Sequence, residues 1–187
     1  MLLTKNIGKV VLLLMICFIG IQLASNAYGV EIFESDEFNF SFTIPDGWIE
    51  LDNGLVPGVK ALVRSASEGA STNCNVRAVL NSQFDSTTSE DYITMIYPNG
   101  DPRNFISEYE ASGLNPELIT SSIIKVDGTD ALYIELYIST QGTKFQTFNI
   151  QFLKNGGLYT MGCTDIPEKF HASKGDFDTI TGTFKVR

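Results

Sequence analysis

The chain has 187 residues, with 13 lysines and arginines against 22 aspartates and glutamates, and a formal net charge of −9 at pH 7. A chain of this length forms one ordinary domain once a short leader is removed. An excess of carboxylates repels phosphate backbones and anionic lipid surfaces, which argues against a nucleic-acid partner and against attachment to an anionic membrane. The acidity indicates a soluble protein.

Residues 1–27 have the three parts of a secretory signal peptide. Lys5 and Lys9 make a positive start, Val10–Ile21 is apolar and uncharged, and Ser25-Asn26-Ala27 places small residues before a cleavage site. A retained membrane anchor is the alternative, but the apolar run is shorter than the roughly 20 residues that a spanning helix needs. We therefore expect cleavage after residue 27, a single mature domain over 28–187, and export to the periplasm or the exterior without stable membrane insertion.

Two cysteines remain after the signal peptide is removed, because Cys17 leaves with it. An even number of cysteines in an oxidising compartment favours a disulfide between Cys74 and Cys163. The alternative is two separate buried thiols, since cysteine also behaves as a small hydrophobic residue. The Cys-x-x-Cys spacing of redox enzymes is absent from the chain.

The mature sequence opens with strand patterns, after an acidic segment at 30–37. Residues 38–44 alternate strictly between apolar and polar side chains, which predicts a half-buried strand. Pro45-Asp46-Gly47 supplies a turn. Two further strands are predicted at Lys60–Ser65 and Asn73–Leu80. The second of these places on one face Cys74, Val76, Ala78 and Leu80.

Two helices follow these strands. Thr87 and Glu90 have the spacing of a capping box, and Pro98-Asn99-Gly100 ends the first helix. Asp101 is expected to cap the second helix, with proline at its first position and Gly113 past its end. The apolar stripes are Tyr92, Ile93 and Ile96 in the first helix and Phe105, Ile106 and Tyr109 in the second.

The last third of the chain returns to strands and ends in a helix. Four strands are linked by short turns that contain glycine, so antiparallel hairpins are expected. The turns are Asp127-Gly128, Gln141-Gly142 and Asn155-Gly156-Gly157. One broken helix is predicted over Pro167–Ile180, and Thr183–Val186 closes the domain. The predicted fold class is α+β, an antiparallel β-sheet flanked by helices. The four strands are Leu118–Val126, Ala131–Ser139, Lys144–Leu153 and Leu158–Cys163.

Several of these segments together resemble PsbP-like domains. The stretch Phe40–Trp48 (FSFTIPDGW) is similar to the start of such domains, and Val126–Ala131 (VDGTDA) and the hairpin to Gly157-Leu158-Tyr159 continue the pattern. A tail with Phe170 and Phe177-x-x-Ile180, ending in Thr183-Phe184, completes it. The resemblance covers residues 38–186 and implies a PsbP-like α/β/α sandwich.

The PsbP-like group includes the oxygen-evolving accessory protein of photosystems, the Ran-binding Mog protein and bacterial periplasmic proteins of the DcrB type. The resemblance therefore implies an accessory or interaction module without enzymatic activity. It carries no shared functional residue over to this chain. A Ran-binding role does not suit an exported protein.

No catalytic, cofactor or metal residue is assigned from the sequence. A Ser-His-Asp triad would need His171, the only histidine, and no Gly-x-Ser-x-Gly elbow is present. A pairing of His171 with Cys163 would be silenced by a disulfide. Asp165, Glu168 and His171 make a weak metal set. Asp127–Asp130 is too short for an EF-hand loop and is typical of a hairpin turn.

The leading expectation is an exported, non-enzymatic accessory protein that binds another envelope or secreted protein and needs no cofactor. The alternative is a protein that binds a small molecule or a lipid-like ligand in a pocket lined by its 13 phenylalanines and seven tyrosines. A secreted hydrolase is the third reading. Trp48, the only tryptophan, is expected to pack in the core.

Overall fold

The computed structural model describes residues 30–52, 56–67, 71–140 and 142–187. No helix within these ranges is long and apolar enough to cross a membrane. The strands are β1 (Glu31–Ser35), β2 (Phe40–Ile44), β3 (Trp48–Glu50), β4 (Val59–Ser65), β5 (Asn73–Leu80), β6 (Asn115–Val126), β7 (Thr129–Thr140), β8 (Thr143–Lys154), β9 (Gly157–Asp165) and β10 (Lys185–Val186). The helices are α2 (Ser89–Ile96), α3 (Arg103–Ala111) and α4 (Pro167–Gly182), with short 3-10 turns at Ser82–Phe84 and Pro98–Gly100.

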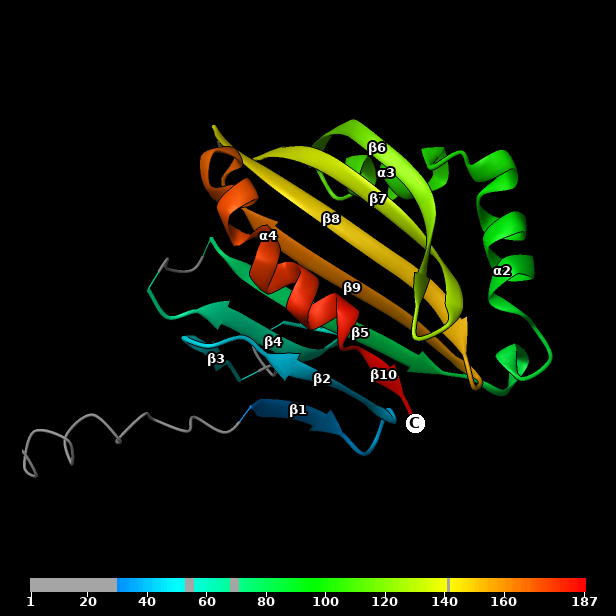
Figure 1. Ribbon diagram of the computed structural model, residues 1–187. Coiled ribbons are helices and arrows are strands. Elements are labelled where there is room, and N and C mark those ends of the chain that lie inside the picture. The colour runs from blue at the N-terminus through cyan, green and yellow to red at the C-terminus, as the bar shows by residue number, and fades with distance from the viewer. Residues whose placement is uncertain (1–29, 53–55, 68–70, 141) are drawn as a thin grey trace, which may run out of the picture.

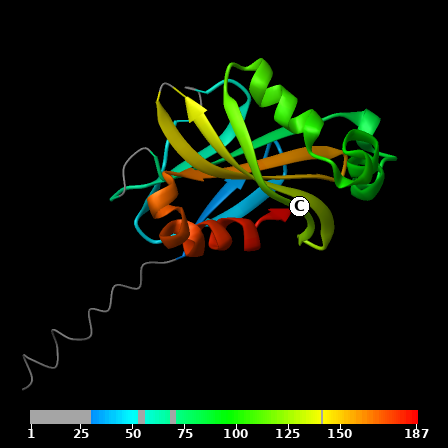
Figure 2. The ribbon, with the colours of Figure 1, turned by 90° about the horizontal axis from the view of Figure 1, so that it is seen from above.

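Two antiparallel sheets form the frame of the molecule. The larger has seven strands in the order β3-β4-β5-β9-β8-β7-β6, and the smaller has the order β1-β2-β10 (Figure 1). Helix α4 lies on one face of the large sheet, and α2 and α3 lie on the opposite face (Figure 2). This arrangement confirms the predicted α+β fold of an antiparallel sheet between helical layers.

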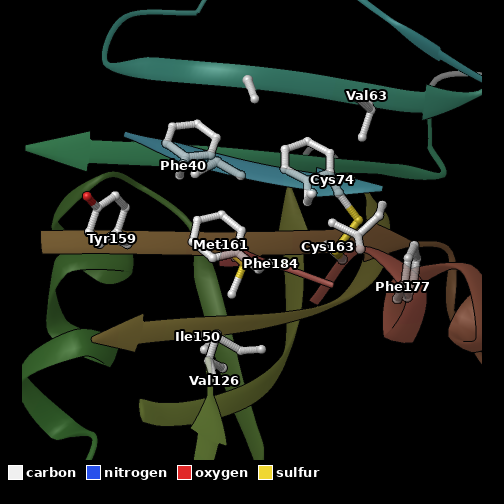
Figure 3. Close-up of a cluster of buried hydrophobic side chains, with 14 of the residues drawn as sticks. Phe40, Val63, Cys74, Val126, Ile150, Tyr159, Met161, Cys163, Phe177 and Phe184 are labelled. Atoms are coloured by element: carbon white, nitrogen blue, oxygen red, sulfur yellow. A yellow bond between two sulfur atoms is a disulfide. The ribbon is translucent and has the colours of Figure 1, made fainter. Parts of the chain in front are cut away.

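The core under α4 is built from aromatic side chains (Figure 3). Phe40 stacks on Phe184 at 5.3 Å between ring centroids, and Phe152 stacks on Tyr159 at 5.5 Å. All four rings are buried. Phe40, Phe152 and Tyr159 come from β2, β8 and β9, Phe184 lies between α4 and β10, and together these rings bury a large apolar area. The aromatic side chains therefore pack on one another as a core.

A second apolar cluster lies under α2 and α3, on the other face of the large sheet. It joins the helical stripe of Tyr92 and Ile93 to one face of β7. The tyrosines of β7 point the other way, and Tyr133 stacks on Phe148 near α4. The side chains of β7 in the second cluster are Leu132, Ile134, Leu136 and Ile138.

The first strands differ from the prediction. Residues 31–35, expected only as an acidic lead-in, form strand β1, which pairs with β2. Strand β2 begins at Phe40 and not at residue 38, because Asn39 has a positive φ of 54° within the turn between β1 and β2. Asparagine tolerates this left-handed conformation. Strand β1 carries one buried side chain, Phe33, so its alternation is weak in the sequence.

The predicted hairpins of the last third are present and antiparallel. Asp127 and Gly128 both have positive φ, as do Asn155 and Gly156. This is the pattern of type I′ turns, whose twist matches that of the flanking strands. The predicted turn at Gln141-Gly142 lies partly outside the described residues. Strands β6, β7 and β8 have 12 residues each and are longer than predicted.

The helix ends differ from the prediction by small shifts. The cap of α2 is Thr88 and not Thr87, because the Thr88 hydroxyl accepts a hydrogen bond from the Asp91 backbone N–H at 3.1 Å. Asp101 accepts one from the Arg103 N–H at 3.0 Å, although proline occupies the formal cap position of α3. Helix α4 is continuous and not broken. Its buried stripe keeps helical spacing throughout, with Phe170, Ser173, Phe177 and Ile180.

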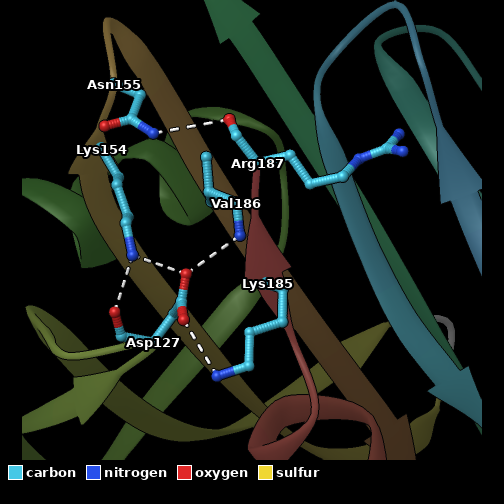
Figure 4. Close-up of polar contacts among 6 residues, drawn as sticks. All are labelled: Asp127, Lys154, Asn155, Lys185, Val186 and Arg187. Carbon is cyan, nitrogen blue, oxygen red and sulfur yellow. Dashed lines mark hydrogen bonds and ion pairs between the residues drawn. The ribbon is translucent and has the colours of Figure 1, made fainter.

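The C-terminal strand is held against the hairpin turn that follows β6 (Figure 4). The Asp127 carboxylate accepts hydrogen bonds from the Lys154 ammonium at 2.5 Å and the Lys185 ammonium at 3.0 Å. It also accepts one from the Val186 backbone N–H. The Asp127–Asp130 segment is therefore a hairpin turn with a structural carboxylate, as its sequence indicates.

Candidate functional site

A polar pocket of about 560 Å³ lies on the large sheet beside α3. Its floor comes from three neighbouring strands, β5, β9 and β8, whose side chains on this face are mostly polar over the middle of each strand. The register aligns them in rungs across the sheet, since Asn75 lies opposite Gly162 and Gly162 opposite Asn149. Arg77, Thr160 and Gln151 form the next rung.

The centre of the floor is a hollow above Gly162. A Cβ atom at this position would lie 3.0 Å from Asn149 Oδ1 and 3.4 Å from Asn75 Nδ2. The missing side chain therefore lets the two amides close over the backbone from the adjacent strands, with room for less than a methyl group between them. Asn75 Nδ2 donates one hydrogen bond to the Gly162 carbonyl at 3.3 Å. We call this feature the Gly162 hollow, made of Asn75, Gly162 and Asn149.

Asn149 is the unusual residue of the hollow. Its exposed fraction is only 8%, and its Nδ2 atom makes no hydrogen bond of ordinary geometry within the described part of the chain, although the Asn149 side chain interacts with the Tyr109 hydroxyl closely enough to lower the pKa of that group. Buried amides are nearly always paired, because desolvating an unpaired N–H costs free energy. The Asn149 amide therefore contacts the α3 wall through Tyr109 and is not an open donor in the pocket.

Other polar groups of the floor are held in place by hydrogen bonds. The Tyr97 hydroxyl donates to Gln151 Oε1 at 2.7 Å, and Gln151 Nε2 donates to the Thr160 hydroxyl oxygen at 3.3 Å. Burial raises the pKa of Tyr97, so it stays a neutral donor. Because Thr160 accepts from Gln151, its own O–H is free to donate into the pocket.

Helix α3 makes the wall of the pocket. Phe105 anchors the helix in the second apolar cluster and contacts the ring of Tyr109. Burial raises the pKa of Tyr109, and a hydrogen bond with the Asn149 side chain and the charge of Arg77 partly offset this effect. Tyr109 thus brings a neutral hydroxyl to the pocket wall, beside the Asn149 amide.

One cation and one anion line the pocket, Arg77 from β5 and Glu108 from α3. Both side chains are exposed. Arg77 makes no ion pair with the residues that the structure describes, although acidic residues outnumber basic ones in the chain. The remaining lining groups are amides, hydroxyls and apolar side chains. The arrangement is suited to hydrogen bonding with a polar group.

The cysteines predicted to pair form a disulfide on the other face of the same strands. Cys74 and Cys163 lie directly opposite each other on β5 and β9, and their sulfur atoms are bonded (Figure 3). Both are buried in the aromatic core. Cys163 follows Gly162, so the disulfide crosslinks the two strands beneath the hollow. It leaves no thiol at Cys163 for a pairing with His171.

The weak metal set does not come together. Asp165 is fully buried and accepts hydrogen bonds from the Thr72 and Ser173 hydroxyls at 2.9 and 2.6 Å. Glu168 and His171 are exposed on α4. Across the described ranges, no three His, Cys, Asp or Glu side chains are grouped to hold a metal ion. Asp165 therefore joins β9 to α4 and to the turn before β5.

The expected burial of Trp48 is found. The ring is 4% exposed and makes an edge contact with Phe177 at 6.0 Å between centroids. Its indole N–H donates to Asp176 on α4 at 2.9 Å. Trp48 thus joins an edge strand to the helix.

Sequence reasoning missed the polar pocket altogether. A signal was present, because the residues between the core positions of β5 are Asn73, Asn75 and Arg77, and β8 and β9 show the same alternation. What the sequence lacks is the pairing of β5 with β9, whose partner residues lie 77 to 91 positions apart in the chain. Without that register, three polar strand faces cannot be recognised as one surface.

A family model described as PsbP matches residues 28–186. Among curated proteins no match was found. The solution structure of cyanobacterial PsbP (CyanoP) from Synechocystis sp. PCC 6803 is 22% identical, with 84% of this chain and 92% of that chain covered and a TM-score of 0.61.

Two other solved structures share the fold. A crystal structure from Bacteroides thetaiotaomicron is 16% identical with a TM-score of 0.55. The match covers 84% of this chain and 48% of that chain. LpqN of Mycobacterium tuberculosis, described as involved in cell envelope biogenesis, is 10% identical with a TM-score of 0.50, covering 86% of this chain and 87% of that one. Identities this low show the fold alone. The family model matches nearly the whole chain after residue 27, and the protein therefore belongs to the PsbP family.

Proposed function

We propose that this protein is an exported accessory protein that binds a partner through the polar pocket and catalyses no reaction. The observation that carries the proposal is the open polar pocket on the face of β5, β9 and β8, which is lined by amides and hydroxyls and by the exposed side chains of Arg77 and Glu108. Most groups around it are amides and hydroxyls, which do not titrate near neutral pH. Such side chains suit recognition by hydrogen bonds better than proton transfer.

Export is supported by three independent features. The signal-peptide pattern of residues 1–27, which lies outside the described residues, is the first. The Cys74–Cys163 disulfide is the second, since disulfides persist in oxidising compartments. The third is the fold shared with LpqN, a protein described as involved in cell envelope biogenesis. We place the protein in the periplasm or outside the cell.

A partner with a polar contact group fits the site better than a lipid-like ligand does. The aromatic side chains that could have lined an apolar cavity are in ring-to-ring contact, as Phe40 is with Phe42, Tyr159 and Phe184. The open pocket on the other face of the sheet has a polar floor. The occupant is therefore expected to bring hydrogen-bonding atoms to that face.

Site-specific photocrosslinking in the native envelope tests the proposal. A photoreactive amino acid is placed at Ser112, an exposed residue that lines the pocket, and captured proteins are identified by mass spectrometry. The matched control carries the same group at Lys174, an exposed residue of α4 on the opposite face. The expected result is one partner that is captured from Ser112 in an amount close to that of the protein itself and that is not captured from Lys174.

Two results would overturn the proposal. Equal capture from both positions would show that contact at the pocket is not specific. A substrate turned over by the purified protein, with turnover lost on changing one pocket side chain, would show an enzyme instead.

A further inference from the structure

Strand β6 (Asn115–Val126) is the outer strand of the large sheet, with β7 on one side and no other strand of the described chain on the other (Figure 1). The free edge of a long strand presents unpaired backbone N–H and C=O groups to any extended chain beside it. Proteins usually protect such edges with charged side chains or by keeping the edge strand short. The opposite end of this sheet is short in this way, because β3 has only three residues.

The middle of β6 lacks this protection. The strand has 12 residues, and those from 118 to 124 carry no charge. Large apolar side chains are exposed there, with Leu118 at 43%, Ile119 at 39% and Ile123 at 50%. An uncharged edge with exposed isoleucines is a surface that a second strand would cover.

A bulge at Ile119 modifies one end of this edge. The register with β7 passes from Leu118 directly to Thr120, so Ile119 has no partner on β7. Bulges blunt some edges by twisting them, but the pairing with β7 is regular from Thr120 to Val126. The regular part of the edge is therefore free to pair with another strand.

The sequence of this edge indicates which strand fits it, because it is similar in both directions from Ser121. Two hydroxyl residues flank Ser121, then two isoleucines, and an acid and a base lie four positions away on either side. The pairs are Thr120 and Ser122, Ile119 and Ile123, and Glu117 and Lys125. A copy of the strand laid antiparallel, with Ser121 on a twofold axis, places the members of each pair opposite each other.

We propose that β6 pairs with β6 of a second copy of this chain, antiparallel and centred on Ser121, so that two large sheets join into one. Ile119 of each copy then packs on Ile123 of the other. The bulge interrupts the register beyond Ile119, but Glu117 and Lys125 have long, exposed side chains that bring opposite charges together at both ends. The proposal goes beyond the function proposed above, since the described residues that line the polar pocket include none of β6.

Other registers of the same pairing fit less well. Directly opposite residues in an antiparallel pair point to the same face, so the axis can move only to another residue of the strand. An axis at Ser122 would place Ser121 opposite Ile123, and an axis at Thr120 would place Ser121 opposite Ile119. Each sets a hydroxyl against an isoleucine and moves the end charges out of line.

Cysteine crosslinking tests the register. Directly opposite Cα atoms in an antiparallel pair are about 4.5–5.5 Å apart, which a disulfide can bridge. Ser121→Cys is therefore expected to give a covalent dimer under mild oxidation. Ile123→Cys is more exposed but would lie more than about 10 Å from its own copy, so it should crosslink only when mixed with Ile119→Cys. Cys74 and Cys163 are bonded to each other in the core and do not compete.

Sedimentation equilibrium of the purified protein measures the dimer. The contact is smaller than in permanent dimers, so a dissociation constant in the micromolar range is expected. Lys125→Glu places like charges together at both ends and should weaken the dimer about tenfold, and Glu117→Lys/Lys125→Glu should restore it. Both residues make only exposed ion pairs within their own copy, so the fold is kept. Lys174→Glu makes the same charge change on α4 and should leave the dimer unaltered.

The proposal fails if the protein remains monomeric at millimolar concentration, or if Ser121→Cys and Ile123→Cys crosslink alike. Failure of the double charge variant to restore what Lys125→Glu loses would also contradict it. A photoreactive group at Ile123 that captures a different protein, while the purified chain is monomeric, would assign the edge to a foreign strand and reject the dimer.

Discussion

The carboxylate of Asp127 accepts a hydrogen bond from the backbone N–H of Val186 at 3.1 Å, although 59 residues separate them. The same carboxylate also binds the ammonium groups of Lys154 and Lys185. The hairpin turn between β6 and β7 therefore holds β10, the C-terminal edge strand of the small sheet. The interaction is local in space and distant in sequence, and its strength depends on pH.

Acid should lower the free energy of unfolding by protonating Asp127. Burial raises the pKa of Asp127, but hydrogen bonds from Lys154, Val186 and Lys185 outweigh this and lower it from 3.8 to about 2. Because the folded-state pKa is depressed, the stabilisation is complete above pH 3.8 and is lost as the pH falls towards 2. Asp127→Asn should lower the free energy of unfolding at pH 7 by about 1–2 kcal/mol. Urea unfolding at pH 7 and pH 3 measures both effects.

Asp130→Asn is the control for this prediction. Asp130 pairs with Lys125, an exposed side chain, at 2.8 Å, so its loss should cost less than about 1 kcal/mol. Equal destabilisation by the two variants would contradict a special role for Asp127. So would unchanged sensitivity to acid in Asp127→Asn.

Asn149 and Thr147 should respond in opposite ways to the loss of their polar atoms. Thr147 is buried and satisfied, since its hydroxyl donates to the Cys163 carbonyl at 3.0 Å and accepts from Thr164 at 2.9 Å. Thr147→Val should therefore lower the unfolding free energy by about 1 kcal/mol. Asn149→Leu removes a buried amide whose Nδ2 makes no hydrogen bond of ordinary geometry, and it should leave stability unchanged or raise it by up to about 1 kcal/mol.

Thermal and urea unfolding of the two variants measure this contrast. A loss of more than about 2 kcal/mol in Asn149→Leu, matching or exceeding that of Thr147→Val, would show that the amide is structural. Unchanged stability with lost partner binding would mark Asn149 as a residue kept for recognition.

The Cys74–Cys163 disulfide should contribute about 2–4 kcal/mol to stability, because it closes a loop between residues 89 apart in the unfolded chain. Adding a reductant should lower the midpoint of urea unfolding in the native protein. The double variant Cys74→Ala/Cys163→Ala should have a similarly low midpoint and should not respond to reductant. Identical midpoints of the native protein with and without reductant, at equilibrium, would contradict the prediction.

Asp176 should report on Trp48. Asp176→Ala removes the acceptor of the indole N–H, leaving a mostly buried donor unpaired, and should cost about 1–2 kcal/mol. Since Trp48 is the only tryptophan, the intrinsic fluorescence should change at the same time. Asp178→Ala, on the same helix, loses only an exposed pair with Lys174 and should cost about 0.5 kcal/mol or less. Indistinguishable spectra and stabilities of the two variants would exclude the proposed contact as a stabilising one.

Local patterns in the sequence determined much of this protein. Alternation predicts β4, β5 and the strands from β6 to β9, and the Asp127-Gly128 and Asn155-Gly156 turns predict their hairpins, because both signals act over a few residues. The count of mature cysteines predicts the disulfide, and the ordered motifs from Phe40 to Phe184 predict the family and its sandwich fold. The predicted N-cap of α2, Thr87, differs from the observed cap by one residue, and the predicted start of β2 differs by two.

The tertiary structure alone decided the candidate site. Asn75 reaches the Gly162 carbonyl across 87 residues of chain, and Asn149 joins them because β8 and β9 form one hairpin. This register is set by burial of the opposite faces of the same strands, where the disulfide and the aromatic rings must meet. A polar strand face in the sequence predicts only exposure to solvent. Whether three such faces make a pocket depends on pairing between distant strands, which no local pattern encodes.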